Sequence, residues 1–428
     1  MSQELRPASP PAPYPEKGWP TAAASMPREA LGRQGWNVLA GDLPFPCALL
    51  KSSALEANSR AMTAFLEMTG ARLCPHGKTS MSPELFHRQI ADGAWGITAA
   101  NARQMQVMRA SGVERVLIAN QLAGKAEIAA VSEALHAPGF ELYVLVDSID
   151  GVADLDLRLT PPEGTRLQVL LEVGQTGGRT GARSLAAAME VARAVAASRN
   201  LALRGVEAFE GILHGASQAE LEAKVAALYQ ALAAAARACE AEGLFASGPV
   251  ILSGGGSAFY DMAAEGIATT GLKAPSVMVI RSGCYLTHDS KWLADYYARM
   301  RARSPEVTAP LPAPEPAIEI WAAVQSMPEP GLALVTMGKR DVSYDMDLPL
   351  ALKWAGDGMA APEALSGHRV TALNDQHAYL DCPPDSPLKV GDLIGFGVSH
   401  PCTTFDKWRL MAVVDDNYQV IDAIGTCF

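Results

Sequence analysis

Short aliphatic runs alternate with longer, alanine-rich stretches of helical period between Leu43 and about Gly283. The apolar runs number eight and are Arg72–Pro75, Gly96–Ala99, Val116–Ala119, Leu142–Val146, Leu167–Val173, Gly205–Leu213, Val250–Ser253 and Val277–Arg281. One helical stretch begins at Ser217, with Glu220 completing a capping box, and ends at Gly243. Eight strands that alternate with helices over about 240 residues are typical of a (β/α)8 TIM barrel. We therefore predict an α/β barrel; an open, doubly wound sheet is the alternative.

A second pattern begins after residue 303. The sequence SPEVTAPLPAPEPAIE is rich in proline and is typical of a linker, and few helical patterns follow it. Strand-like runs separated by turn residues are Ile318–Val324, Leu332–Met337, His368–Leu373, Leu393–Val398 and Arg409–Val414. We therefore expect a second, mainly β C-terminal domain. We expect three parts: a poorly ordered tail over residues 1–25, a barrel over 26–303 and the β domain over 304–428. The first segment of the barrel part (26–50) could pack on the β domain.

The composition permits a sizeable core and narrows the class of partner. Of the 428 residues, 49% are hydrophobic and 19% are charged, which excludes a wholly disordered chain. The formal net charge is -11, which argues against nucleic acid as the main partner because phosphate binding needs clustered Lys and Arg. No apolar run reaches the roughly 18 residues of a membrane helix, and no basic run marks an anionic membrane surface.

The cysteines and the first residues indicate the compartment. The seven cysteines are scattered and form no CxxC motif, which fits free thiols in a reducing environment. The N-terminal sequence MSQELRPASPPAPYPEKGWP lacks the basic and apolar regions of a secretory signal. We therefore expect a cytoplasmic protein.

Three loops that follow predicted strands carry candidate chemistry. Lys78, in CPHGKTSM, follows the first run; a lysine at a barrel mouth can form a Schiff base, although a lone loop lysine is usually only solvated. Ser253 begins SGGGSAFY after the seventh run, and RSGCYLTHD follows the eighth, where this fold recurrently binds phosphate. A lysine and two glycine loops together predict a phosphorylated carbonyl cofactor, for which pyridoxal phosphate is the obvious candidate.

The segment VSHPCTTFDKW in the β domain contains a candidate metal pair. His400 and Cys402 are two residues apart, so on a strand their side chains would share a face. Imidazole and thiolate suit zinc, and two protein ligands fit an open site that substrate and water complete. Taken without the rest of the chain, incidental placement is the simpler interpretation.

These motifs lie within a longer resemblance. The matching segments, in order from about residue 42 to 410, are DLPFPCALLKSSALEANSRAM, PHGKTSMSPELFHRQIADGAWGITAANARQMQVMRASG, VLIANQ, EVGQTGGRTG, ILSGGGS, SGCYL, NDQH and SHPC. The chain resembles the alanine racemase-like, fold-type III pyridoxal-phosphate enzymes, in the branch of D-serine dehydratases and D-threonine aldolases. The resemblance implies a cofactor-carrying barrel, a C-terminal β domain and a homodimer. Two departures, PHGKTSM for PHAKTHK and HGAS for GHSY, leave the substrate size open.

The resemblance also implies roles for individual residues. Lys78 would be the Schiff-base lysine and the base for the α-proton, and His377, in NDQH, would line the same mouth as a second catalytic residue. The implied cofactor-binding residues are Lys78, Arg179, His214, Ser253, Gly255, Gly256, Gly283, Cys284 and Tyr285. His400 and Cys402 would bind a divalent metal; the thiolate favours zinc, with manganese or another ion as the alternative.

The implied reaction is a metal-assisted dehydration of β-hydroxy D-amino acids such as D-serine or D-threonine. This carbon–oxygen lyase would release a 2-oxo acid and ammonia by β-elimination, and the metal pair favours it over racemisation, which needs no metal. Retro-aldol cleavage to glycine and an aldehyde is the close alternative; the cysteine favours dehydration, because an oxygen ligand is expected there in the aldolases. An amino-acid racemase or a non-catalytic pyridoxal-phosphate carrier is a further alternative, although a carrier has no use for the β domain. The sequence leaves the substrate side chain and the metal open.

Overall fold

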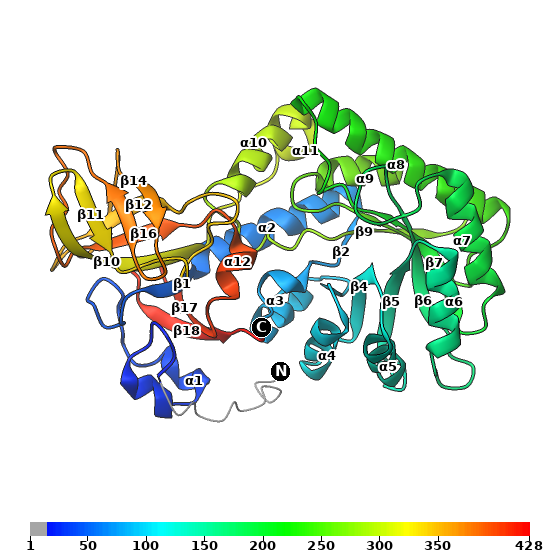
Figure 1. The fold of residues 1–428 in the computed structure, drawn as a ribbon, viewed down its shortest axis with the longest axis horizontal. Coiled ribbons are helices and arrows are strands. Elements are labelled where there is room, and N and C mark those ends of the chain that lie inside the picture. Colours follow the sequence, from blue (N-terminus) through cyan, green and yellow to red (C-terminus); the bar gives the residue numbers. More distant parts are fainter. Residues whose placement is uncertain (1–14) are drawn as a thin grey trace.

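The computed structural model describes residues 15–428, which form a barrel and a β domain (Figure 1). The barrel is an eight-stranded sheet with the order β2-β9-β8-β7-β6-β5-β4-β3, and its strands are parallel. The strands are β2 (Arg72–Leu73), β3 (Ile97–Ala99), β4 (Arg115–Gln121), β5 (Glu141–Val146), β6 (Leu167–Val173), β7 (Leu201–Ala208), β8 (Val250–Gly254) and β9 (Ser276–Ile280). The two ends of the sheet meet at a parallel bridge between His76 and Thr98. The sheet therefore curls into a closed barrel, and the predicted fold class is confirmed.

Helices connect consecutive barrel strands and cover the outside of the sheet. They are α3 (Pro83–Ala91), α4 (Ala102–Ala110), α5 (Lys125–Ala134), α6 (Ile149–Arg158), α7 (Leu185–Ala197), α8 (Gln218–Ala241) and α9 (Tyr260–Ala268). The bounds of α8 follow from its caps, as the sequence predicts. Ser217 Oγ accepts a hydrogen bond from Glu220 N at 3.2 Å, and Glu220 Oε2 accepts one from Ala216 N at 2.8 Å. Gly243 ends the helix region with a φ of +66°, which favours glycine.

The predicted run Gly205–Leu213 is displaced in the structure. Strand β7 begins at Leu201 and ends at Ala208, so the apolar residues that follow leave the barrel wall. They form a turn instead, in which Leu213 N donates to Glu210 O at 2.9 Å. Leu213 packs against the core between the barrel and its helices, so its apolar character is explained by this packing rather than by strand pairing.

The inward-facing residues of the barrel strands change from apolar to polar and charged along the barrel axis. A separate apolar cluster fills the interior and contains Cys74, Leu117, Ala119, Tyr143, Leu145, Leu170, Ile251 and Val279. Two residues further along their strands, the same alternation places Glu172, Ser253 and Arg281, all of them buried. The carboxyl end of the barrel is therefore lined by polar and charged groups, and this is the end at which barrel enzymes carry their sites.

The β domain is a ten-stranded sheet that includes a strand from before the barrel. Its strands are β1 (Cys47–Lys51), β10 (Ile318–Glu329), β11 (Leu332–Val335), β12 (Leu350–Ala355), β13 (Glu363–Ala364), β14 (Arg369–Leu373), β15 (Ala378–Asp381), β16 (Leu393–Gly397), β17 (Leu410–Val414) and β18 (Val420–Gly425). Strand β1 pairs antiparallel with β10 and parallel with β17. The chain therefore enters the β domain first, builds the barrel, and returns.

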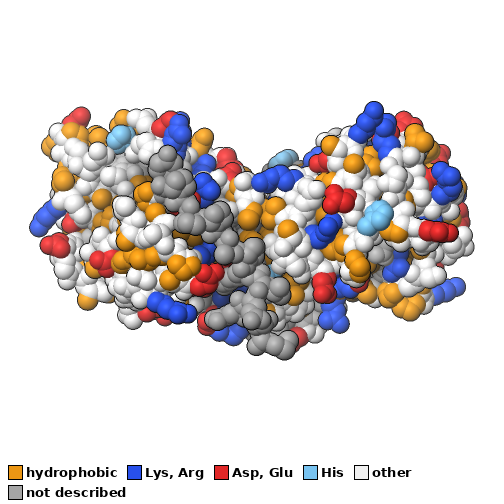
Figure 2. Space-filling view, turned by 90° about the horizontal axis from the view of Figure 1, so that it is seen from below, with side chains coloured by type: hydrophobic (Ala, Val, Ile, Leu, Met, Phe, Trp, Pro, Cys, Tyr) orange, Lys and Arg blue, Asp and Glu red, His pale blue; other side chains and the backbone are white. Residues whose placement is uncertain are grey.

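The remaining helices lie outside the set that connects the barrel strands. They are the 3-10 helix η2 (Thr21–Ser25) and the helices α1 (Arg28–Leu31), α2 (Ser52–Thr69), α10 (Trp292–Arg303), α11 (Pro305–Thr308) and α12 (Pro401–Phe405). Of the tail expected over residues 1–25, residues 1–14 lie outside the described residues, and Trp19 is buried against the β domain. Figure 2 shows acidic and basic side chains interspersed over both parts on one face of the molecule. Within residues 15–428, no helix combines the length and the apolar character that a membrane crossing requires.

Candidate active site

Lys78 lies in a tight turn that follows β2. The turn is the 3-10 helix η3 (Gly77–Thr79), and Met81 N closes it by donating to Gly77 O at 2.9 Å. A Cβ on Gly77 would lie 2.5 Å from Met108 Cε and 2.7 Å from Ile97 Cγ2, so a side chain there would displace the turn. The packing beneath Gly77 therefore fixes the backbone from which the exposed Lys78 side chain projects.

The segment after β9 lies directly against this turn. A Cβ on Gly283 would lie 2.6 Å from His76 O and 3.0 Å from Thr79 Oγ1, so the close approach requires glycine. The next residue, Cys284, has its Sγ 3.6 Å from Thr79 Oγ1. The Tyr285 ring is buried in the core that the barrel shares with the β domain. The structure thus brings the predicted Gly283–Tyr285 loop to the Lys78 turn through its backbone.

The glycine loop after β8 is held from inside by an acid that sequence analysis did not identify. Gly256 N donates to Glu210 Oε1 at 2.6 Å, and Gly255 N donates to Tyr229 Oη at 2.8 Å. Tyr229 Oη in turn donates to Glu210 Oε2 at 2.7 Å, and the Glu210 side chain is fully buried. Next to this network, Ser253 Oγ is buried and has no hydrogen-bond partner within residues 15–428. Gly255 N also donates to Glu210 Oε2 at 3.3 Å, so both loop amides bind this carboxylate, while the serine hydroxyl is available.

A buried ion pair lies at the carboxyl ends of β7 and β9. Arg281 Nη2 lies 2.5 Å from Glu207 Oε2, and the two side chains are 5% and 0% exposed. Burial raises the pKa of Glu207 to about 8, although the Arg281 charge opposes the shift. His76 Nδ1 is also buried without a partner within residues 15–428, and burial together with the charges of Lys78 and Arg281 lowers the pKa of His76. The floor of the mouth therefore combines a neutral imidazole with a guanidinium.

Replacing Arg281 with methionine is expected to destabilise the fold by about 2–3 kcal/mol at about pH 10, because the pKa of Glu207, about 8 beside Arg281, rises further without that cation, so only the wild-type protein keeps an ionised, paired Glu207 there. The loss should shrink towards about pH 6, where Glu207 is a neutral buried acid in both proteins. Urea unfolding of both proteins at the two pH values measures this. The double variant with Glu207→Gln should recover most of the loss; an equal loss in the double variant would assign the cost to packing.

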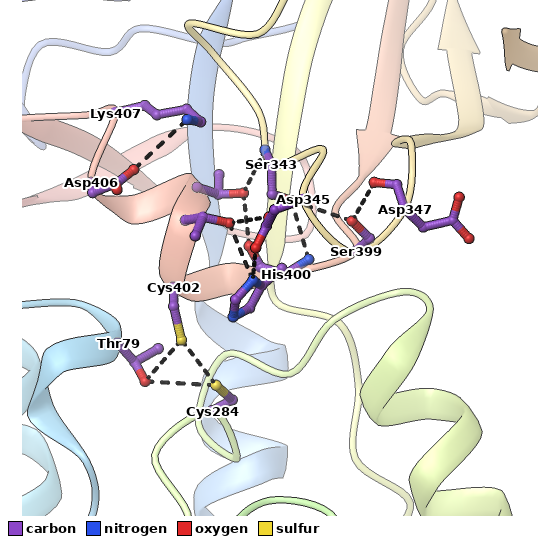
Figure 3. A network of polar contacts seen from close by, with 12 residues as sticks. Thr79, Cys284, Ser343, Asp345, Asp347, Ser399, His400, Cys402, Asp406 and Lys407 are labelled. Carbon is purple, nitrogen blue, oxygen red and sulfur yellow. Dashed lines mark hydrogen bonds and ion pairs between the residues drawn. The ribbon is translucent and has the colours of Figure 1, made fainter. Parts of the chain in front are cut away.

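The predicted metal pair lies where the β domain meets the Lys78 turn. His400 precedes α12, and Pro401 begins that helix, so the pair does not lie on a strand as the sequence pattern indicated. Cys402 Sγ lies 3.5 Å from Thr79 Oγ1 and 3.5 Å from Cys284 Sγ (Figure 3). The structure therefore brings His400 and Cys402, from one end of the chain, next to Lys78, Gly283 and Cys284. Within residues 15–428 no three His, Cys, Asp or Glu side chains form a metal-binding group.

Hydrogen bonds orient His400 from behind. His400 Nδ1 lies 2.6 Å from Asp345 Oδ2, and Asp345 Oδ1 accepts a hydrogen bond from Thr403 Oγ1 at 2.6 Å. Burial lowers the pKa of His400, but its contacts with Cys402 and Asp345 outweigh burial and raise that pKa to about 9. The thiol of Cys284 and the imidazole of His400 lower the pKa of Cys402, although burial opposes them. Asp345, in SYDMD, was not identified from the sequence, where nothing separates it from neighbouring acids.

Three predicted residues lie further out. Arg179 is exposed in the loop after β6, with its guanidinium 5.1 Å from the centre of the Phe209 ring. His214 is exposed beyond β7, and its carbonyl accepts a hydrogen bond from Lys224 Nζ at 2.8 Å. His377 lies in the turn between β14 and β15. Across the described part of the chain, no hydrogen bond or ion pair joins these three residues to Lys78.

Two family models match the chain. The alanine racemase N-terminal domain matches residues 50–274, and the putative serine dehydratase domain matches residues 317–414. Among curated relatives, a 3-hydroxy-D-aspartate aldolase of Paracoccus denitrificans (strain Pd 1222) is 29% identical over 86% of this chain and 88% of its own. A D-threonine aldolase of Arthrobacter sp is 25% identical over 87% and 89%. A D-threo-3-hydroxyaspartate dehydratase of Delftia sp. (strain HT23) is 29% identical over 58% and 62%.

Solved structures of related proteins share the fold. The D-threonine aldolase of Filomicrobium marinum superposes with a TM-score of 0.73 at 25% identity, covering 92% of this chain and 96% of that one. The Delftia dehydratase superposes with a TM-score of 0.69 at 20% identity, covering 91% and 99%. A cysteine-to-alanine mutant of that dehydratase in the metal-free form gives a TM-score of 0.68 at 20% identity, covering 92% and 99%.

Proposed function

The chain belongs to the alanine racemase N-terminal domain family of fold-type III pyridoxal-phosphate proteins, and we propose that it is a lyase that dehydrates β-hydroxy D-amino acids. The products would be a 2-oxo acid and ammonia. The observation that carries this proposal is the placement of Cys402, adjacent to His400, against the turn that presents Lys78. The relatives that are named as aldolases and dehydratases of hydroxy D-amino acids support the lyase class and the D configuration.

The residues at the mouth fit pyridoxal phosphate. When bound, this cofactor supplies the aldehyde that takes up the substrate amine and a ring that withdraws electrons from Cα. Lys78 would hold the aldehyde carbon from its turn. The unpartnered Ser253 hydroxyl and the close backbone at Gly283 support a phosphate site, because both lie where barrels recurrently bind phosphate. Glu210 would keep the glycine loop in place from inside.

The other predicted cofactor contacts are part of the same proposal. Arg179 would face the cofactor from the loop after β6, and its position over Phe209, beside Glu210, supports this. Gly255 and Gly256 would let the backbone approach the phosphate, and Cys284 and Tyr285 would contribute their amides. His214 and His377 stay predictions, because no contact in the described residues connects them with the Lys78 turn.

The donor set at the β-domain edge of the mouth fits a divalent metal. Asp345 engages Nδ1 of His400, which leaves the second ring nitrogen free to face away from Asp345 (Figure 3). That nitrogen and the sulfur of Cys402 would hold the metal, for which a thiolate donor favours zinc. The metal, when bound, would supply a Lewis acid at the substrate hydroxyl. The relative that was solved in a metal-free form supports metal use in this family.

Lys78 would also move a proton. When its amine is free of the cofactor, Lys78 would be able to take the proton from Cα and hold it. Thr79, the next residue, contacts Cys402 Sγ, so Lys78 and the metal pair approach the substrate from neighbouring backbone positions. This arrangement supports removal of the α-proton and departure of the β-hydroxyl in one site.

Measurement of 2-oxo acid release tests the proposal. The purified protein is incubated with D-serine, D-threonine and D-threo-3-hydroxyaspartate, with and without a chelator. Release that the chelator stops and zinc restores is the expected result. Exchange of the α-proton without a 2-oxo acid would identify a racemase instead, and absence of 2-oxo acid, glycine and α-proton exchange with pyridoxal phosphate bound would identify a carrier.

Retro-aldol cleavage is the second candidate, because two of the aldolase relatives match more than four-fifths of this chain, at 86% and 87%. It differs in which bond to the β-carbon breaks, and its products are glycine and an aldehyde. The same assay separates the two reactions, since glycine formed in place of a 2-oxo acid would exclude dehydration.

Replacing Asp345 with asparagine is expected to weaken metal binding by about 10–100-fold, because the carboxylate that fixes the His400 ring is lost while both donors remain. Competition with a chromogenic chelator measures the affinity. Asp347→Asn is a matched control, since its carboxylate lies 3.7 Å from Lys291 Nζ and is not bonded to His400. Equal affinities of the wild-type protein and Asp345→Asn would mean that the contact between Asp345 and His400 does not contribute to metal binding.

The proposed setting is a cytoplasmic homodimer. Seven free cysteines fit a reducing compartment, and the interspersed charges in Figure 2 fit a small-molecule partner better than nucleic acid. Within the chain we propose a barrel domain over residues 26–303 that carries the cofactor, with its first segment (26–50) packed on the β domain through β1, and a β domain over 304–428 that carries the metal pair. Light scattering of the purified protein gives the mass that tests the dimer.

A further inference from the structure

Two cysteines from distant parts of the chain meet at the junction of the barrel and the β domain. Cys284 follows β9 of the barrel, and Cys402 lies in α12 of the β domain. Their sulfurs are 3.5 Å apart although the residues are 118 positions apart in sequence (Figure 3). The hydroxyl of Thr79 touches both sulfurs, at 3.6 and 3.5 Å. The two thiols therefore face each other beside the turn that carries Lys78.

The other cysteines in the described residues are placed differently. Cys47, Cys74 and Cys239 are buried in apolar cores. Cys382 Sγ donates to the carbonyl of Leu380 at 3.5 Å. Cys427 is the penultimate residue, and its backbone N donates to Met81 O at 2.9 Å. Within residues 15–428, Cys284 with Cys402 is the one cysteine pair whose sulfurs are in contact, and both residues are partly exposed. The two sulfurs of this pair are therefore in contact with each other and lie on residues that solvent can reach.

We propose that Cys284 and Cys402 are a modification site at which a peroxide forms a disulfide. A disulfide has its sulfurs about 2.05 Å apart, so they must approach by about 1.5 Å from their present contact. Cys284 lies in a loop and Cys402 in a five-residue helix, so small backbone or rotamer changes can supply this movement. The inference does not need either residue to bind cofactor or metal.

The chemistry balances with a peroxide as the oxidant. One thiolate attacks a peroxide oxygen, the O–O bond breaks, and a sulfenic acid and one water form. The second thiolate then attacks the sulfenic sulfur, the S–O bond breaks, and a second water leaves. Two thiols and one hydrogen peroxide therefore give one disulfide and two waters. A reducing dithiol reverses the modification.

The modification would act on the proposed reaction, and this consequence rests on the proposed function. A disulfide consumes the sulfur of Cys402, which is then no longer a thiolate donor next to His400. The oxidised protein would lose its metal and its turnover together, and reduction would restore both. The covalent link would also join α12 to the loop after β9, across the mouth.

Thiol counting and peptide mapping test the pair without reference to activity. The full-length, metal-depleted protein is treated with hydrogen peroxide, unfolded, and titrated with a chromogenic thiol reagent. Free thiols should fall by two from the seven of the reduced chain, and digestion should yield a linked peptide containing Cys284 and Cys402. Cys284→Ser should yield no such peptide, whereas the control Cys382→Ser should still lose two thiols.

The outcomes separate the proposal from the proposed function. A thiol count unchanged by peroxide, or a link that maps to other cysteines, overturns the proposal. A linked peptide from a protein that releases no 2-oxo acid even when reduced would leave the modification standing and overturn the proposed function. Zinc that stays bound to the linked form would exclude Cys402 as its ligand.

Discussion

Replacing Lys78 with alanine is expected to lower kcat for 2-oxo acid release by about 10³–10⁴-fold, because the variant loses both the covalent anchor of the cofactor and the base for the α-proton. The structure indicates that this substitution lowers activity without unfolding the protein. The Lys78 side chain is exposed, and Gly77 and Met81 define the turn through backbone contacts, so the fold should keep its stability to within about 0.5 kcal/mol. Steady-state kinetics and urea unfolding measure the two quantities.

A second readout connects the loss to the covalent role. Borohydride treatment should fix pyridoxal phosphate to the wild-type protein on a peptide that contains Lys78, and should fix none to Lys78→Ala or Lys78→Arg. Lys125→Ala removes an exposed lysine at the start of α5 and is the matched control, with unchanged kcat and labelling. A kcat within tenfold of the wild-type value in Lys78→Ala would mean that another residue anchors the cofactor.

The barrel could be predicted from the sequence because its strands are local features. Each buried strand is a short apolar run between helical stretches, as Leu167–Val173 is, and this pattern identifies a strand without knowledge of its neighbours. The displaced end of β7 shows a limit of this approach. Leu213, at the end of the predicted run, packs against the barrel core from outside the strand, and the sequence alone does not distinguish such packing from strand pairing. Strand β1 shows another limit, because its pairing with β10 and β17 closes contacts over more than two hundred residues.

Some residues of the site could likewise be predicted from the sequence and others could not. Lys78 and the pair of His400 and Cys402 stand in short motifs with unusual residue types, so they could be identified from the sequence. Glu210 and Asp345 could not be identified from the sequence, because their roles depend on the groups they contact in the folded chain. Glu210 binds two loop amides, and Asp345 binds an imidazole ring. The inward alternation that leads from Leu170 to Glu172 was a usable signal for the charged layer. It needed the strand register, which the sequence alone leaves open by one residue.

Replacing His400 or Cys402 with alanine is expected to remove the bound metal and to lower kcat by at least about 10²–10³-fold, because Lewis-acid help with a poor leaving group is worth several kcal/mol. Metal analysis of the purified variants and 2-oxo acid kinetics measure the two effects. His368→Ala and Cys382→Ala are matched controls, since His368 bonds Ser366 and Ser386 in the β domain, away from α12. Wild-type metal content in either site variant would place the metal elsewhere.

A substitution at Cys402 also distinguishes dehydration from retro-aldol cleavage. Cys402→Asp replaces the sulfur donor with an oxygen donor, so it should keep a divalent metal while Cys402→Ala loses it. If the thiolate is what favours departure of the hydroxyl, Cys402→Asp should release less 2-oxo acid and more glycine than the wild-type protein. An unchanged product ratio at full metal content would mean that the donor atom does not choose between the bonds. The choice would then lie with the residues that orient the substrate, among which Arg179 is a proposed cofactor contact.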